Sequence, residues 1–164
     1  MTFDARPSAT RQALVLTFFL GVCLTIGAIG GAVTSTSVTT WYPHLRKPSF
    51  NPPDWVFSPV WTALYISMAV AAWNIWRRRG RQSTRLAMFL FAGQLALNLA
   101  WSILFFGLQQ IGLALIEIIL LFAAITGTAL AFGRLDRTAA LLFIPYIAWV
   151  GFATLLNLAI WRLN

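Results

Sequence analysis

Five long runs of apolar residues, separated by short polar segments, dominate the pattern of the chain. The hydrocarbon core of a bilayer is about 30 Å thick and an α-helix rises about 1.5 Å per residue, so about 20 apolar residues can cross it. We therefore expect five membrane-spanning helices, over residues 12–33, 58–76, 86–106, 111–132 and 139–161. The runs do not alternate between apolar and polar positions, which argues against a transmembrane β-barrel. The pattern predicts an all-α, five-helix membrane bundle that forms one domain over residues 1–164.

The first run has some features of a secretory signal peptide. Arg6 and Arg11 precede it, and small residues lie near its end. Its apolar stretch is longer than the roughly 7–15 residues of a signal-peptide core. We therefore expect it to remain in the protein as the first membrane span.

Composition supports a membrane protein and excludes two other classes. Apolar residues make up 59% of the chain, charged residues 10%, and the mean hydropathy is +0.76. Soluble domains have about 45–50% apolar and about 25% charged residues, so a water-soluble monomer and a disordered chain are both excluded. The net charge of +8 would suggest a nucleic-acid partner in a soluble protein. Here the charges lie between apolar runs, so no nucleic-acid partner is expected.

The positive charges also predict an orientation. Nine arginines lie in the N-terminal segment and in the connections after the second and fourth spans, which share one side of the membrane: Arg6, Arg11, Arg77, Arg78, Arg79, Arg81, Arg85, Arg134 and Arg137. The other side holds Arg46, Lys47 and Arg162. Because cytoplasmic segments carry an excess of Lys and Arg, the N-terminus is predicted to be cytoplasmic. The cluster at residues 77–81 is either a topology determinant alone or also a site for acidic lipid headgroups.

The connection over residues 34–57 is much longer than those at residues 107–110 and 133–138, which force antiparallel neighbours. It starts with serines and threonines and continues with tryptophans and prolines. Long loops in compact proteins are usually functional or disordered, and the aromatic residues between Trp41 and Phe57 argue against disorder. We expect a long structured loop between the first two helices.

The third expected helix has two different faces. Gln94, Asn98 and Trp101 share one face, because they are spaced four and three residues apart. Ala92, Ala96 and Ala100 form the opposite face, and small residues at this spacing let two helices approach closely. The polar face is expected to point into the bundle. The alanine face either packs within the bundle or forms a homodimer.

Three tryptophans share helix faces with polar or small neighbours. They are Trp61, Trp101 and Trp149, and a buried indole N–H needs an acceptor such as the side chain of Asn98 or Asn157. Indoles that point inward beside a few amides would form an apolar pocket for a small molecule. Ordinary packing of an aromatic core explains the same pattern, and both interpretations stay open at this point.

Residue types that usually carry enzyme chemistry are few. Glu117 is the only acid within a span, and it is either functional or a structural acid that is protonated or hydrogen-bonded. His44 and Cys23 are the only histidine and cysteine, so neither a transition-metal site nor a Ser-His-acid triad is expected. Gly27 and Gly31 form a G-x-x-x-G pattern, which is typical of close helix packing.

Three blocks of sequence resemble the TspO/MBR family, the tryptophan-rich sensory proteins of bacteria and the mitochondrial translocator proteins. The first block is W-Y-P-H-L-R-K-P-S-F-N-P-P at residues 41–53 with W-T-A-L-Y at residues 61–65. The second is G-Q-L-A-L-N-L-A-W at residues 93–101 with F-F-G at residues 105–107. The third is P-Y-I-A-W at residues 145–149 with F-A-T-L-L-N at residues 152–157. The blocks follow the order of the family's motifs along nearly the whole chain.

The resemblance implies a five-helix bundle, usually dimeric, with a pocket under the loop after the first helix that all five helices line. Such proteins bind porphyrins, haem-like tetrapyrroles, sterols and synthetic drugs of the isoquinoline and benzodiazepine types. Carried over by motif, the implied ligand-binding residues are Tyr42, Pro52, Phe57, Trp61, Tyr65, Asn98, Trp101, Trp149, Ala153 and Leu156. The implied ligand is protoporphyrin IX or haem, held without a covalent bond, and its propionates are expected to meet Arg46 or Lys47.

Three functions are compatible with the resemblance. The first is a sensor of the bacterial cell envelope that regulates tetrapyrrole or stress responses. The second is an enzyme-like promoter of the light- and oxygen-dependent breakdown of protoporphyrin IX, for which the implied catalytic residues are Trp61 and Trp149. The third is a transporter of sterols or porphyrins, although the sequence shows neither the repeats nor the broken helices typical of transporters.

Two departures from the family pattern concern its other ligands. The cholesterol motif of the mitochondrial proteins needs a tyrosine where this chain has Leu158 and Ala159. Leu113 stands where the animal proteins have a tryptophan. The first departure argues against cholesterol recognition of the mitochondrial type, and the second predicts weak binding of the synthetic drugs. Membrane lipid and sterols in general remain expected partners.

Overall fold

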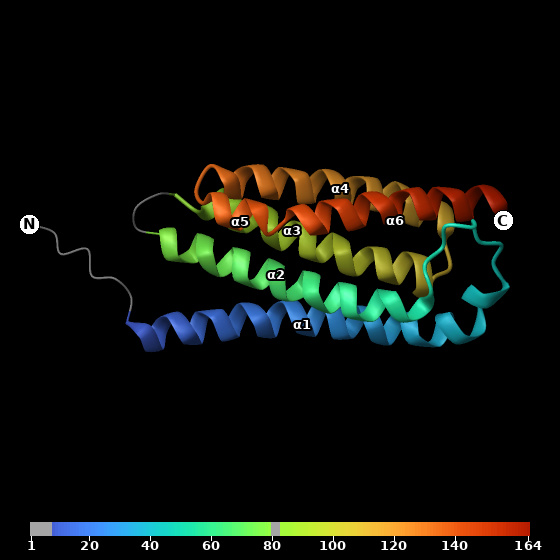
Figure 1. The fold of residues 1–164 in the computed structure, drawn as a ribbon, viewed down its shortest axis with the longest axis horizontal. Helices are drawn as coiled ribbons and strands as arrows, with labels where there is room; N and C mark the ends of the chain where they lie inside the picture. The colour runs from blue at the N-terminus through green and yellow to red at the C-terminus, as the bar shows by residue number, and fades with distance from the viewer. Residues whose placement is uncertain (1–7, 80–82) are drawn as a thin grey trace, which may run out of the picture.

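The computed structural model describes residues 8–79 and 83–164, and these residues form an elongated helical bundle (Figure 1). The main helices are α1 (Ala9–Thr40), α2 (Phe57–Arg78), α3 (Arg85–Ser102), α4 (Ile111–Gly133), α5 (Arg137–Leu141) and α6 (Ile144–Leu163). Short 3₁₀ turns, η1 (Tyr42–His44) and η2 (Asp54–Val56), lie between α1 and α2, and a π-helical turn, η3 (Ile103–Gly107), ends α3. The expected all-α architecture is confirmed for the described part of the chain.

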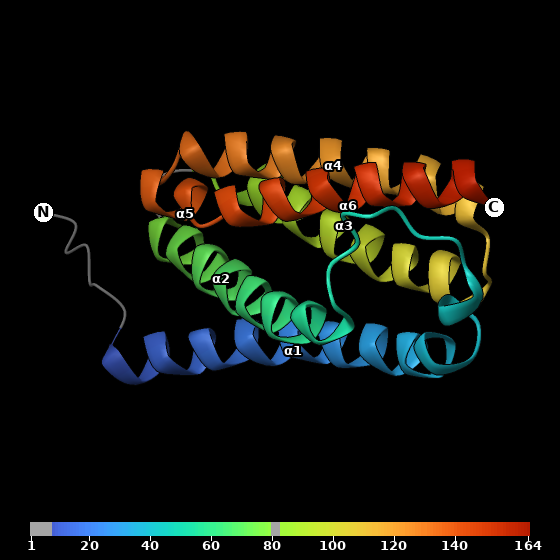
Figure 2. The same ribbon diagram turned by 45° about the vertical axis from the view of Figure 1, so that its right-hand side comes forward.

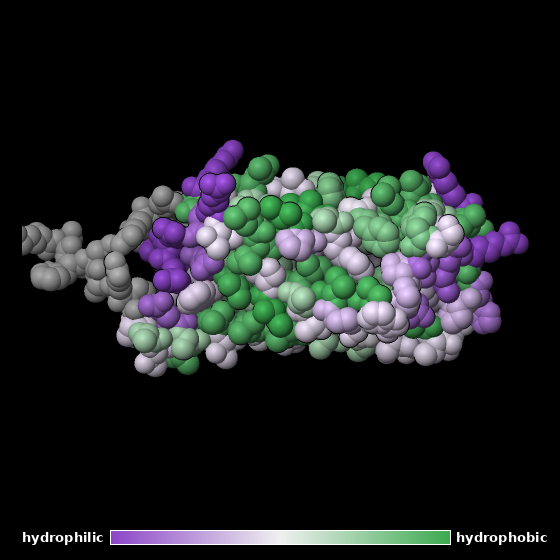
Figure 3. All heavy atoms as spheres, viewed as in Figure 1, coloured by the Kyte–Doolittle hydropathy of each residue, from purple (hydrophilic) through white to green (hydrophobic). Residues whose placement is uncertain are grey.

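Within residues 8–79 and 83–164, five helical segments are long and apolar enough to cross a membrane, as predicted. They are Ala9–Thr40, Asp54–Arg78, Arg85–Gly107, Ile111–Gly133 and Arg137–Leu163. On the face shown in Figure 3, hydrophilic side chains gather at the two ends of the bundle and hydrophobic ones fill the middle. This distribution matches a bilayer core between two polar interfaces.

The expected loop boundary at Thr34 is wrong, because α1 continues to Thr40. The serines and threonines of this stretch satisfy their hydroxyls within the helix. Thr34 Oγ1 donates to the carbonyl of Gly30 at 2.8 Å, and Thr40 Oγ1 donates to the carbonyl of Thr36 at 2.7 Å. Such bonds let a polar sequence remain helical where water is scarce. The connection between α1 and α2 is therefore residues 41–56, called the lid below.

The fifth span is broken near one end, which the sequence pattern did not predict. The break separates α5 from α6 at residues 142–143, just before Pro145, which has no N–H to continue the hydrogen-bond ladder. Ser67 Oγ on α2 donates to the carbonyl of Leu142 at 2.8 Å. The break lies at the end of the bundle opposite the lid (Figure 1), and not at mid-span, where transporters place discontinuous helices.

Packing divides the bundle into an inner group and an outer helix. Helix α4 packs against both α3 and α6, whereas α1 packs mainly against α2 and less extensively against α3. Gly27 makes the approach of α1 possible, because a Cβ added there would lie 2.7 Å from the ring of Tyr65. Gly31 has no such neighbour within 4 Å, so the expected glycine pattern serves packing at Gly27 alone. Figure 2 shows α2 crossing α1 obliquely while the lid runs toward α6 and back.

Asp136 links α5 to α2 at the end of the bundle that lies opposite the lid. Its carboxylate accepts a hydrogen bond from the N–H of Ala139 at 2.9 Å and so caps α5. It also accepts hydrogen bonds from Arg78 Nε at 3.0 Å and Nη2 at 2.6 Å. Burial raises the pKa of the Asp136 carboxyl, but the hydrogen bonds from Ala139 and Arg78 outweigh it and hold this pKa below its ordinary value. The ionised carboxylate therefore stabilises the folded state.

Replacing Asp136 should separate its two contributions. Asp136→Ala removes the cap and the ion pair and should cost about 1–2 kcal/mol of unfolding free energy. Asp136→Asn keeps a good cap and loses only a partly exposed ion pair, so it should cost less than about 1 kcal/mol. Because the folded-state pKa is depressed, the stabilisation is complete above the unfolded pKa of about 3.9 and disappears as pH falls through the folded value. Thermal unfolding in detergent at pH 7 and below pH 4 measures both effects, and equal costs for the two variants would contradict this assignment.

Candidate functional site

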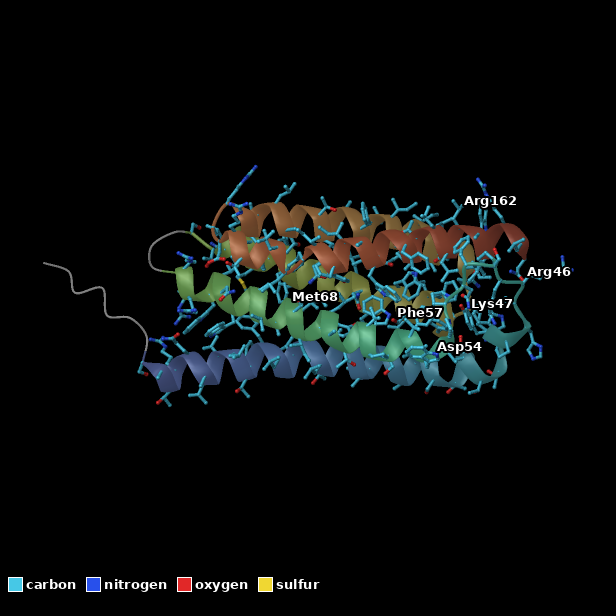
Figure 4. The ribbon with its side chains drawn as sticks, in the orientation of Figure 1. Arg46, Lys47, Asp54, Phe57, Met68 and Arg162 are labelled. Carbon is cyan, nitrogen blue, oxygen red and sulfur yellow. The ribbon has the colours of Figure 1, made fainter. Side chains whose placement is uncertain are left out.

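A cavity of about 560 Å³ lies between α1, α2 and α3 at the lid end of the bundle. Its volume falls within the roughly 300–1,000 Å³ typical of small-molecule sites. Aromatic rings from three elements form much of the wall: Phe57 and Trp61 of α2, Trp101 of α3 and Phe106 of η3. Figure 4 shows the side chain of Phe57 inside the bundle, close to the lid.

Six of the ten predicted ligand-binding residues line this cavity. They are Tyr42, Phe57, Trp61, Tyr65, Asn98 and Trp101. The other four, Pro52, Trp149, Ala153 and Leu156, are not among the lining residues in the described part of the chain. Ala153 and Leu156 are buried on α6, and α6 and α4 lie behind the cavity instead of facing it.

The structure also assigns a large part of the wall to α1, a helix that the resemblance placed at the pocket without implying particular residues of it. Leu24, Ala28, Gly31, Ser35 and Val38 line the cavity along one face of this helix. Their spacing of three and four residues was visible in the sequence as a stripe of mostly small residues. The stripe includes Gly31, which the G-x-x-x-G pattern assigned to close helix packing and not to a cavity wall.

The floor of the cavity is a chain of hydrogen bonds between α2, α3 and α6. Tyr65 Oη donates to Asn98 Oδ1 at 2.5 Å, and Asn98 Nδ2 donates to Tyr146 Oη at 2.7 Å. Tyr146 Oη in turn donates to Gln94 Oε1 at 3.1 Å. Gln94 and Asn98 are 0% and 2% exposed, so the polar face of α3 points into the bundle as predicted.

Two of the wall tryptophans are held by specific neighbours. Trp101 Nε1 donates to Asn157 Oδ1 at 3.2 Å, and its ring stacks on Phe105 with centroids 5.3 Å apart. The ring of Trp61 lies 5.8 Å from that of Tyr65 and is tilted by 33°. The indoles are thus fixed in place, as a surface for a flat ligand requires.

Trp149 has a different environment from these two. Its ring packs edge-on against Phe57 at 5.7 Å and beside Phe152 at 5.7 Å. Its buried Nε1 has no hydrogen-bond partner among residues 8–79 and 83–164. Trp149 therefore supports the cavity wall from behind, through Phe57.

The lid is ordered by contacts at both of its edges. Tyr42 Oη donates to Asn51 Oδ1 at 2.8 Å, and Lys47 Nζ lies 4.4 Å from the centre of the Tyr42 ring. Burial and then the negative charge of Asp54 raise the pKa of Tyr42 to about 12, so its phenol stays a neutral hydrogen-bond donor. At the other edge, the Asn164 side chain accepts from the N–H of Arg46 and donates to its carbonyl, both at 3.0 Å.

Comparison with known proteins agrees with this architecture. The sequence profile of the TspO/MBR family matches residues 19–162. The chain belongs to the TspO/MBR family. It is 42% identical to the tryptophan-rich protein TspO of Chlorobaculum tepidum, over 94% of this chain and 98% of that protein. It is 40% identical to the translocator protein of Sus scrofa, over 85% of this chain and 86% of that one, and 38% identical to the tryptophan-rich sensory protein of Cereibacter sphaeroides, over 93% and 92%.

Glu117 is a buried acid of this TspO/MBR protein that lies outside the hydrogen-bond chain of the cavity floor. It is 8% exposed on α4, and neither carboxylate oxygen has a hydrogen-bond partner among the described residues. It does not line the cavity. Among the described residues it is therefore not the hydrogen-bonded acid that was one of the expected alternatives.

Removing the central amide of the cavity floor should destabilise the bundle. Asn98→Leu leaves the hydroxyl of Tyr65 without its acceptor and that of Tyr146 without the bond from Asn98, and should cost about 1–2 kcal/mol of unfolding free energy. Tyr65→Phe should cost less in the Asn98→Leu background than in the wild type, because the partner is then already gone. Denaturation in detergent of the two single variants and the double variant measures this coupling. Strictly additive costs would show that the Tyr65–Asn98 bond contributes nothing.

Proposed function

We propose that this TspO/MBR protein binds a flat, apolar ligand of the tetrapyrrole class, such as protoporphyrin IX or haem, in the cavity under the lid. It then acts as a membrane sensor that regulates tetrapyrrole or stress responses. The observation that carries the proposal is the aromatic wall of Phe57, Trp61, Trp101 and Phe106 around a cavity of ligand size. Stacking on such rings contributes about 0.5–1.5 kcal/mol per pair beyond the burial of area.

The charged edge of a porphyrin would lie at the lid. Its two propionates stay near water, and Lys47 is the better placed of the two predicted cations, because its amine lies over the ring of Tyr42, a lining residue. Figure 4 shows the Arg46 side chain at the outer edge of the lid, directed away from the bundle. A charge-assisted hydrogen bond from Lys47 would fix the direction of the ligand in the cavity.

Light-driven breakdown of the porphyrin is a second candidate function, and the position of Trp61 favours it. An electron-rich indole on the cavity wall would lie against the ligand, and the protein would position the ligand for its own photochemistry. Trp149 does not line the cavity, and the ring of Phe57, which does, packs against it. If the protein has this function, Trp61 contacts the porphyrin and Trp149 supports the cavity wall.

The proposed setting is a bacterial cell envelope with the N-terminus in the cytoplasm and a homodimer formed through α3. Arg77 and Arg79 lie over Trp73 and Trp76 at 4.7 and 3.9 Å, a contact typical of a membrane interface at the end of α2. Arg6 and Arg81, which also support the orientation, lie outside the described residues. Ala92 and Ala96 are exposed on α3 and Ala100 is half-buried, so this face is free to meet a second copy or membrane lipid and sterol.

Substitution of the two tryptophans tests the proposed binding and the photochemistry separately. Trp61→Phe keeps an aromatic wall, so protoporphyrin IX should still bind in the dark within a few-fold of the wild-type affinity. Its light-driven loss should fall strongly in Trp61→Phe and much less in Trp149→Phe, and it should vanish in the double variant. Quenching of tryptophan fluorescence in the dark and porphyrin fluorescence under illumination are the two measurements. Failure of the wild type to bind protoporphyrin IX would overturn the proposed function, and equal photochemical loss in all variants would overturn the role of the indoles.

Charge reversal at the lid tests the orientation of the ligand. Lys47→Glu should weaken binding of protoporphyrin IX about tenfold or more, since a charge-assisted bond contributes about 1.5–3 kcal/mol. Binding of the uncharged dimethyl ester should change little. Arg46→Glu is the matched control and should have a smaller effect, because that side chain points away from the cavity. An unchanged affinity for the diacid in Lys47→Glu would eliminate the pairing.

A further inference from the structure

The walls of the cavity differ sharply in their exposure. Its floor and lid are closed, since Tyr42, Tyr65 and Asn98 are 4%, 6% and 2% exposed. On α1, in contrast, Leu24 is 41% exposed, and the lining residues Ala28, Gly31 and Ser35 are exposed as well. The cavity therefore opens sideways, through the surface of α1 and its neighbour α2.

Two rows of lining residues define this opening, which we call the α1–α2 fissure. One row is Leu24, Ala28, Gly31 and Ser35 on α1, and the other is Asp54 of the 3₁₀ turn η2 with Ser58 and Thr62 on α2. The second row has a spacing of four residues and all three members are exposed. Asp54 lies at the lid end of α2 in Figure 4, so the fissure extends from the lid toward the middle of α1.

Four of the seven residues of the fissure, Ser35, Asp54, Ser58 and Thr62, are polar, although both of its helices are membrane spans. The hydroxyls of Ser35 and Thr62 donate to carbonyls of their own helices, at 2.8 and 2.9 Å, so they need no partner from outside. Their oxygen atoms can still accept a hydrogen bond. A polar rim beside an aromatic cavity suits a flat amphiphile dissolved in the membrane, with its polar edge toward the lid.

Contacts between the lid and α6 close the side of the cavity that faces water. Asn164 holds the backbone of Arg46 with two hydrogen bonds, and its own amide donates to the carbonyl of Ile160 at 2.9 Å. Phe50 of the lid packs edge-on against Phe152 of α6, with centroids 6.3 Å apart. Entry from water would require these contacts to break, whereas entry through the fissure would not.

We propose that flat amphiphiles pass between the bilayer and the cavity through the α1–α2 fissure, while Asn164 keeps the lid latched to α6. The identity of the ligand rests on the proposed function; the position of the opening does not. Passage in both directions uses the same path, so narrowing the fissure slows entry and exit together.

Two glycines of α1 offer a matched pair of variants. A Cβ added at Gly31 or at Gly21 meets nothing within 4 Å, but only Gly31 lines the cavity. In proteoliposomes mixed with protoporphyrin IX, Gly31→Phe should lower both the association and the dissociation rate constants about tenfold, or about 1.4 kcal/mol of added barrier. Gly21→Phe should match the wild type, and so should Asn164→Ala, because the contact between Phe50 and Phe152 still holds the lid on α6. Stopped-flow quenching of tryptophan fluorescence, with a chase by empty vesicles, gives both rate constants.

The other outcomes decide against the proposal. A faster dissociation of Gly31→Phe with unchanged association would mean that the new ring fills the cavity and does not obstruct an entrance. Faster exchange in Asn164→Ala together with normal rates in Gly31→Phe would place the route at the lid.

A ligand-independent measurement keeps this inference separate from the proposed function. A nitroxide attached to Thr62→Cys should collide often with oxygen, which concentrates in the bilayer, and rarely with a water-soluble nickel chelate. Cys23 is fully buried and should remain unlabelled, which the wild-type chain checks. Low collision rates with oxygen, or high rates with the chelate, would refute an opening to lipid even if protoporphyrin IX does not bind.

Discussion

The hydrogen-bond chain centred on Asn98 is the constraint on which the rest of this structure depends. It joins Tyr65 on α2, Asn98 and Gln94 on α3, and Tyr146 on α6, where water cannot compete for the polar groups. In such a setting an amide left without partners is costly, so the helices have few alternative registers that satisfy all four side chains. The same chain forms the floor of the cavity. The depth of the cavity and the register of three helices are therefore set by one group of contacts.

Helix α1 is held in a different way, and this difference creates the site. It approaches the inner helices closely at Gly27, against the ring of Tyr65, and again where Ser37 Oγ donates to the carbonyl of Phe106. Between these two points Gly30 also lies close to α3, since a Cβ added there would be 3.3 Å from Ser102 Oγ, whereas Ala28, Gly31 and Ser35 line the cavity. The space that remains is the cavity, closed at the bottom by the polar chain and at the top by the lid. The pocket thus lies beside a stretch of α1 whose Gly27 and Gly30 pack against α2 and α3 while its other small residues leave space.

Much of this arrangement could be predicted from the sequence, and the remainder could not for identifiable reasons. The number of spans follows from the length of the apolar runs, and the inward face of α3 follows from the spacing of Gln94, Asn98 and Trp101. Periodicity specifies which side of a helix a residue occupies, but not how far that side lies from a cavity. For this reason Trp61 and Trp149 appeared equivalent in the sequence, whereas the structure separates them by the ring of Phe57. The end of α1 was misjudged because serine and threonine are typical of loops unless their hydroxyls bond back to the helix, as they do here.

The long α1 also explains how the start of the lid is ordered against the bundle. By continuing to Thr40, the helix delivers Trp41 and Tyr42 directly onto the rings of Phe105 and Phe106 in the π-helical turn. That turn widens the end of α3 and leaves a backbone carbonyl, that of Phe106, for Ser37 to bind. The lid is then anchored at its start by aromatic contacts and at its middle by Asn164. The lid is thus fixed at two points, and the hydrogen-bonded floor is rigid, so only the side of the cavity can change in width. The distance between α1 and α2 therefore decides which ligands the cavity can admit.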